Sequence, residues 1–223
     1  RSMTPPTATA AMTSALAWAS WLKAFNHEDF LDFEKRGHTA QSTIDAVYKV
    51  SELKNVDIGL HFILGHPGET PEHAKEQAKF ASSLPISSVK LHNLHVLKAT
   101  KLEKYYEQGL FKPMELEEYS ELVGTFIQYL PEHIAVQRLS ALSSRWEELI
   151  APEWTKRKMT VFQAIISHMS VHKRYQSELY TPQPQTRILP EHFKVKIIDQ
   201  TPFENVLQSL KENPNSTAPL QTL

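Results

Sequence analysis

The residues best suited to chemistry form one short segment, Ile63-Leu64-Gly65-His66-Pro67-Gly68-Glu69-Thr70. Their order indicates the end of a strand, a tight turn and the start of a capped helix. Gly65 and Gly68 permit positive φ and let a ligand approach the backbone closely. Ligands of parallel α/β sheets gather at the carboxyl ends of strands, and a helix N-terminus favours a carboxylate or phosphate. A plain β–α connection, whose glycines only make the turn, accounts for the same spacing.

Histidine is the second source of candidate chemistry, because the chain has 11 of them. We consider His61, His95 and Glu69 for a mononuclear metal site, since imidazole and carboxylate are common ligands. Strand geometry weakens the case, because His92 and His95, three residues apart, would point to opposite faces. We therefore predict no zinc site of the His-x-His or helical His-x-x-x-His type anywhere in the chain. A core histidine with satisfied hydrogen bonds is the simpler interpretation of each.

Arg138 and the segment Pro152-Glu153-Trp154 are weaker candidates. Arg138 ends a predicted strand, where it would bind an anion or form a structural salt bridge. Pro152 fixes the backbone, and the ring of Trp154 is suited to anchoring a loop. Glu153 would be a ligand, an acid/base group or a helix cap.

Composition excludes several classes of site and partner. The 223 residues are 41% apolar and 22% charged, which is typical of one globular domain with tails. Lys+Arg number 24 against 25 Asp+Glu, and no basic stripe typical of a nucleic-acid binder is present. The absence of cysteine excludes disulfides, thiolate nucleophiles and cysteine-held zinc or iron–sulfur centres. No apolar run reaches the roughly 18 residues of a membrane span, and we expect a cytoplasmic location.

Strand and helix signals alternate along the chain, as in the βαβ units of a parallel sheet. Thr70 is a good N-cap, and Pro71 suits the first position of a helix. There are too few strand signals for a closed eight-stranded barrel. The predicted strands are 56–65, 88–97 and 134–139, and the predicted helices are 14–25, 27–36, 42–53, 71 onward, 102–108, 115–129 and 161–172.

Three regions follow from these signals. Residues 1–27 are an atypical, partly helical segment, and residues 28–175 are the α/β domain. Residues 176–223 are a proline-rich extension, with strand character at 193–199, a short helix near 202–212 and a tail that we expect to be disordered.

Several phrases in fixed order resemble one family, the YhcC-type radical S-adenosylmethionine (SAM) proteins, which are relatives of the elongator catalytic subunit. The resemblance covers roughly residues 28–166. The phrases are KRGH (35–38), HFILGHPGET (61–70), LPISSVKLHNLHVLKATKLEKYYEQG (84–109), EEYSELVGTFIQYLPEHIAVQRL (117–139) and LIAPEWTKRKMTVFQAI (149–165).

The resemblance implies a partial (β/α) barrel with about three parallel strands, flanking helices and an extra C-terminal extension. It also implies SAM and a [4Fe–4S] cluster held by three cysteines, whose electron cleaves SAM to a radical. Two of this chain's segments match the strands that meet the adenine of SAM in the family. The implied adenine-side residues are Ile63, Gly65, Pro67, Gly68, Glu69, His95, Val96 and Leu97.

The missing cysteines are the main departure from the family pattern. We therefore interpret the chain as a truncated or degenerate radical SAM-like protein, inactive alone, with a residual half-site for the adenine side of SAM. It has no predicted catalytic residues or metal ligands, and we expect this chain alone to bind neither cofactor. The alternatives are a metal-dependent barrel enzyme using His61, His95 and Glu69, or a non-catalytic interaction module. The expected partners are a missing N-terminal half or a second copy paired through an exposed sheet edge.

Overall fold

The computed structural model describes residues 40–52, 57–143 and 145–188. The predicted helices at 14–25 and 27–36 and the elements expected beyond 190 lie outside these ranges. In chain order the elements are α3 (Ala40–Ser51), β1 (Gly59–Leu64), α4 (Pro71–Ser82), β2 (Ser88–Asn93), β3 (Val96–Leu97), α5 (Lys101–Glu107), α6 (Leu116–Tyr129), β4 (Ala135–Arg138), β5 (Leu149–Ala151) and α7 (Lys158–Val171). Short 3-10 turns at Trp146–Glu148 and Glu153–Lys156 flank β5.

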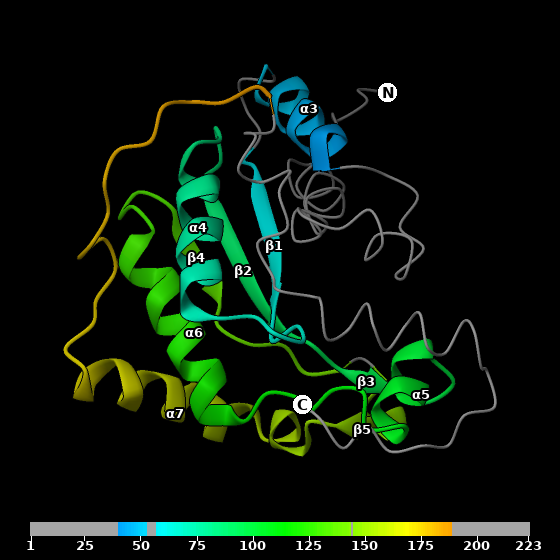
Figure 1. The fold of residues 1–223 in the computed structure, drawn as a ribbon. Coiled ribbons are helices and arrows are strands. Elements are labelled where there is room, and N and C mark those ends of the chain that lie inside the picture. Colours follow the sequence, from blue (N-terminus) through cyan, green and yellow to red (C-terminus); the bar gives the residue numbers. More distant parts are fainter. Residues whose placement is uncertain (1–39, 53–56, 144, 189–223) are drawn as a thin grey trace, which may run out of the picture.

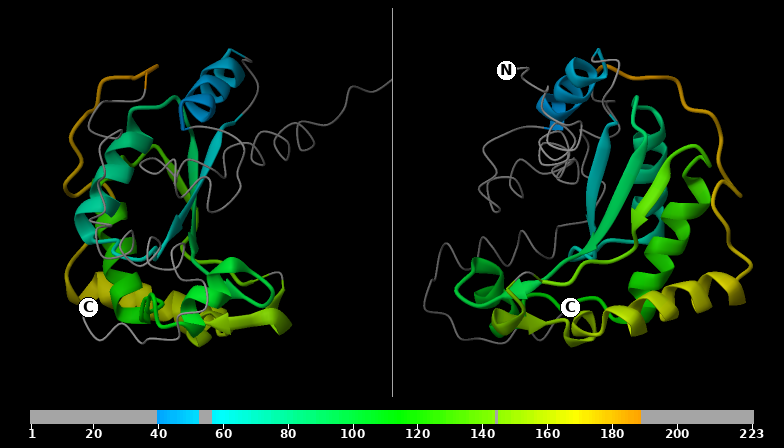
Figure 2. Two further views of the ribbon diagram at one scale, coloured as in Figure 1. Left: turned by 45° about the vertical axis from the view of Figure 1, so that its right-hand side comes forward. Right: turned by 180° about the vertical axis from the view of Figure 1, so that it is seen from behind.

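A three-stranded parallel sheet in the order β1-β2-β4 forms the centre of the molecule. Strand β1 pairs with β2 from Gly59 opposite Ser88 to Leu64 opposite Asn93. Helices α4 and α6 lie side by side on one face of the sheet, while the strands are in front when the molecule is seen from behind (Figures 1 and 2). This arrangement confirms the predicted α/β class with three parallel strands and flanking helices.

The main core lies between the sheet and the two helices. Alternate residues of β1 (Leu60, Phe62, Leu64) are fully buried, as period-two geometry requires for one strand face. Phe62 meets Phe126 of α6 with ring centroids 5.1 Å apart. The small residue Ala78 of α4 is also fully buried.

The predicted strand 88–97 is wrong as a single element, because it breaks after Asn93. Strand β1 ends at Leu64, opposite Asn93, so a longer β2 would have no partner on that side. Residues Val96–Leu97 instead pair antiparallel with β5, in a separate two-stranded sheet that no sequence pattern predicts.

The helix starts follow the expected local chemistry. Thr70 caps α4, and Pro71 is its first residue. The His73 side chain reaches back so that its Nδ1 accepts from the Thr70 backbone N–H at 2.9 Å, which completes a capping box. Helix α7 starts three residues before the predicted position. No helix in the described part of the chain is long and apolar enough to cross a membrane.

Residues 175–188 run as an extended strap from the end of α7 to α3 (Figure 1). The Leu179 N–H donates to the Gln128 carbonyl at 2.9 Å, and the Thr186 N–H donates to the Ser83 carbonyl at 3.1 Å. At its far end the Arg187 guanidinium lies 4.5 Å from the centre of the Tyr48 ring on α3. The described part of the extension is therefore tied to three helices of the domain.

Candidate functional site at the carboxyl edge of the sheet

The glycine-bearing turn after β1 is held closed by its own glutamate. Gly65 and Gly68 have φ of 95° and 73°, in the left-handed region that favours glycine. The Glu69 Oε2 accepts from the Gly65 N–H at 2.6 Å and from the His66 N–H at 2.9 Å. Since only 1% of the Glu69 side chain is exposed, these are buried, charge-assisted hydrogen bonds.

The other carboxylate oxygen of Glu69 faces the helices. The Gln77 Nε2 of α4 donates to Oε1 at 2.9 Å. Burial and then the negative charge of Glu69 raise the pKa of Tyr119 well above its usual range. Tyr119 is therefore a neutral donor, and its hydroxyl donates to the Leu139 carbonyl at 2.7 Å. One carboxylate oxygen of Glu69 thus closes the turn, and the other binds helix α4 through Gln77.

A shallow apolar depression of about 240 Å³, partly open to solvent, lies beside this turn. The Trp154 indole forms one wall, fixed by its Nε1 donating to the Met114 carbonyl at 3.0 Å and by the Tyr119 ring at 5.2 Å. The expected anchoring role of Trp154 is confirmed. The full lining is Leu64, Gly65, Asn93, Leu94, Val96, Pro113, Met114, Tyr119, Pro152 and Trp154.

The structure places the sequence-predicted adenine-side residues in different environments. Gly65 and Val96 line the depression, whereas Leu97 pairs with Leu149 in the small sheet. Ile63 lies on the sheet face that points away from α4 and α6, opposite His92 in register. The carboxylate of Glu69 is engaged within the turn, where Pro67 is half-buried and Gly68 is exposed.

His95 takes part in polar contacts at the same carboxyl edge of the sheet. Its Nε2 lies 2.8 Å from the Asn93 Nδ2, and the Asn93 Oδ1 accepts from the Ala141 N–H at 2.9 Å. Burial lowers the pKa of His95, although a hydrogen bond with the Ala141 backbone opposes the shift. His95 is therefore a neutral residue that joins the end of β2 to the loop after β4.

A second polar cluster, unforeseen in the sequence, lies on the sheet face that points away from α4 and α6. His61 of β1 and His92 of β2 stack with ring centroids 5.0 Å apart and an interplanar angle of 23°. The Nε2 atoms of both are buried and have no hydrogen-bond partner among the described residues. Burial is the largest cause that lowers the pKa of each to about 4. The charges of Lys90 and Arg138 act in the same direction, so both imidazoles are neutral at pH 7.

The metal hypothesis for His61, His95 and Glu69 is not supported by this geometry. Glu69 is occupied by the turn, and His95 by Asn93. In the described ranges, a different group of possible metal ligands has ligand atoms that all lie within 4.8 Å of one another. Its members are Glu117 of α6, His168 of α7 and His172 at the end of α7. Arg138 is exposed and forms no ion pair with any described residue, so its expected salt bridge is not seen there.

Comparison with known proteins agrees with this architecture. Residues 86–170 match the Radical_SAM C-terminal domain. Protein MJ0486 of Methanocaldococcus jannaschii is 32% identical over 139 residues, which are 62% of this chain and 43% of that protein. YhcC of Escherichia coli is 26% identical over 156 residues, 70% of this chain and 50% of YhcC. YtqA of Bacillus subtilis is 27% identical over 154 residues, 69% of this chain and 47% of YtqA.

The solved structure of Methanocaldococcus infernus Elp3 with an N-terminal deletion has a similar fold, with a TM-score of 0.53 and 19% identity. The match covers 69% of this chain and 36% of Elp3. The chain spans about half the length of the curated relatives it matches, or less. These findings confirm the resemblance to the C-terminal part of radical SAM proteins and distant homology to YhcC and YtqA.

Radical SAM proteins use SAM and a [4Fe–4S] cluster, whose iron is held by cysteine thiolates. This chain has no cysteine among its 223 residues. The residues present therefore do not fit the cluster.

Proposed function

We propose that this chain supplies the C-terminal side of a radical SAM-type barrel and cannot cleave SAM reductively by itself. The observation that carries the proposal is the absence of cysteine from a chain that matches the C-terminal domain of this family. Without thiolates there is no anchored iron and no electron source. We propose residues 28–175 as the extent of the domain.

We further propose a weak half-site for the adenine side of SAM at the depression beside Gly65 and Val96. Its apolar lining and the partly exposed Trp154 indole suit a planar base. A ligand the size of adenine, at about 0.3 kcal/mol per non-hydrogen atom, would gain only about 3 kcal/mol. This corresponds to a dissociation constant of a few millimolar.

Ligand-observed NMR with adenosine and with SAM tests the half-site. We expect weak saturation transfer to the adenine protons, and loss of this signal in the variant Gly65→Ala. A Cβ at Gly65 would lie 3.7 Å from the Met114 Cβ, inside the depression. Gly109→Ala is the matched control, because Gly109 also has positive φ but no described residue lies within 4 Å of an added Cβ. Equal signals from both variants would remove the half-site from the proposal.

Anaerobic incubation with iron, sulfide and a reductant tests the absence of cluster chemistry. We expect a colourless protein that forms no 5′-deoxyadenosine from SAM above the protein-free blank. A stable brown protein that cleaves SAM by itself would overturn the proposal. Adding an N-terminal cysteine-bearing domain from one of the relatives is the complementary experiment, and restored cleavage would support a two-part barrel.

A further inference from the structure

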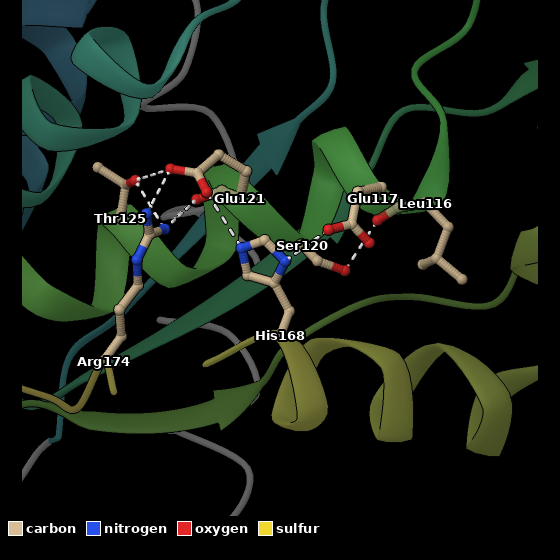
Figure 3. A network of polar contacts seen from close by, with 7 residues as sticks. All are labelled: Leu116, Glu117, Ser120, Glu121, Thr125, His168 and Arg174. Carbon is tan, nitrogen blue, oxygen red and sulfur yellow. Dashed lines mark hydrogen bonds and ion pairs between the residues drawn. The ribbon is translucent and has the colours of Figure 1, made fainter. Parts of the chain in front are cut away.

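Helices α6 and α7 are joined by a polar network around one buried histidine (Figure 3). The His168 side chain of α7 is only 5% exposed. Its Nδ1 lies 2.9 Å from the Glu117 Oε1, and its Nε2 lies 3.0 Å from the Glu121 Oε2, both on α6. A histidine with a carboxylate on each nitrogen is fixed in position and orientation.

Glu121 is itself held in place by further contacts. The Arg174 Nη2 donates to its Oε1 at 2.7 Å, and the Thr125 hydroxyl lies 3.3 Å from the same oxygen (Figure 3). Burial acts to raise the pKa of Glu121, but the hydrogen bonds from Arg174 and His168 outweigh it and lower this pKa. Glu121 therefore presents a charged oxygen to the Nε2 of His168.

A second histidine follows one helical turn later. The rings of His168 and His172 have centroids 4.4 Å apart. One ligand atom each from Glu117, His168 and His172 can be chosen so that all three lie within 4.8 Å of one another. Glu117 and His172 are exposed, so water can reach the group from outside, while His168 closes it from inside.

We propose that Glu117, His168 and His172 form a binding site for a divalent transition-metal cation of the zinc class. Two imidazoles and a carboxylate are a common zinc donor set, and histidines four residues apart lie on one face of a helix. Ligand atoms in a tetrahedral site with bonds of about 2.0 Å lie roughly 3.3 Å apart. The 2.9 Å between His168 Nδ1 and Glu117 Oε1 must therefore open by a few tenths of an ångström, which the exposed Glu117 side chain allows.

The network also supplies a hydrogen-bond acceptor for the second ring nitrogen of His168, as metal-binding histidines usually have. When Nδ1 binds the cation, Nε2–H donates to Glu121, whose position Arg174 fixes. Metal-bound histidines usually donate their second N–H to a carboxylate, which fixes the tautomer and orients the ring. Three protein ligands leave the fourth position to water, so the cation would link α6 to α7 and keep an exchangeable face. This proposal is independent of the half-site and of SAM.

Titration of the full chain with Zn²⁺ by calorimetry tests the proposal, with Co²⁺ absorption as a readout of tetrahedral geometry. We expect one cation per chain with micromolar or tighter affinity. His172→Gln and Glu117→Gln should each weaken binding at least tenfold without unfolding the chain, because both side chains are exposed. His133→Gln is the matched control, because His133 is exposed and lies outside the network.

Binding that is only millimolar, or equal affinity in the wild type and His172→Gln, would overturn the proposal. Loss of affinity in His133→Gln to the same extent would do so as well, because it would indicate general surface binding. Circular dichroism of each variant without metal separates loss of ligand atoms from loss of fold.

Discussion

Replacing Glu69 by alanine removes the acceptor that closes the turn after β1. The change leaves the backbone N–H groups of Gly65 and His66 buried without the carboxylate oxygen that they share. Each unsatisfied buried donor costs about 1–3 kcal/mol, so the free energy of unfolding should fall by about 2–6 kcal/mol. Because domains are stable by only about 5–15 kcal/mol, this is a large fraction of the total.

Glu69→Gln is the informative comparison for this prediction. The glutamine keeps one oxygen for the two backbone amides but turns an NH₂ group toward Gln77. The Gln77 Oε1 is buried and has no partner in the described part of the chain, so after a flip of that amide it would accept from the new donor. We therefore expect Glu69→Gln to cost no more than about 1.5 kcal/mol.

Urea unfolding followed by tryptophan fluorescence measures both variants, with m-values compared to check that the transitions are alike. A loss below about 1 kcal/mol in Glu69→Ala would refute the reasoning, because the two amides would then be satisfied in another way. Equal losses in Glu69→Ala and Glu69→Gln would also refute it, since charge and not hydrogen-bond acceptance would then dominate.

Three further predictions concern the sheet face, the core and the strap. The pKa of His61 and of His92 is about 4 in the fold against 6.5 when unfolded, so the unfolded chain binds more protons between these values. Stability should fall as the pH drops from 6.5 to 4, and urea titrations should show a flatter pH dependence after His92→Leu. Tyr119→Phe leaves the Leu139 carbonyl without its hydroxyl donor, and its thermal unfolding should indicate a loss of about 1–3 kcal/mol. Arg187→Ala removes the cation–π contact with Tyr48 and should cost about 0.5–1 kcal/mol by the same measurement; a change of zero would mean that the strap adds nothing there.

The candidate site was predictable only as far as local chemistry reaches. The glycines at 65 and 68 predict a turn, and both have positive φ in the structure. The contact between Glu69 and Gln77 could not be read from neighbouring residues, since Gln77 is eight residues away on the next helix. The prediction that the chain has no helical His-x-x-x-His zinc pattern is wrong, because His168 and His172 have this spacing. That spacing is the signal in the sequence that indicates the His168 site.

The sequence by itself determined the alternation of strands and helices, the capped turn after β1 and the exclusion of thiolate chemistry. Each of these depends on residue types and near neighbours, which act before the chain is folded. Only the tertiary structure decided that β2 ends at Asn93, that His61 stacks on His92 and that Glu117 meets His168, 51 residues away. Strand register and helix packing bring such groups together, and both are set by burial of the shared core rather than by any local pattern.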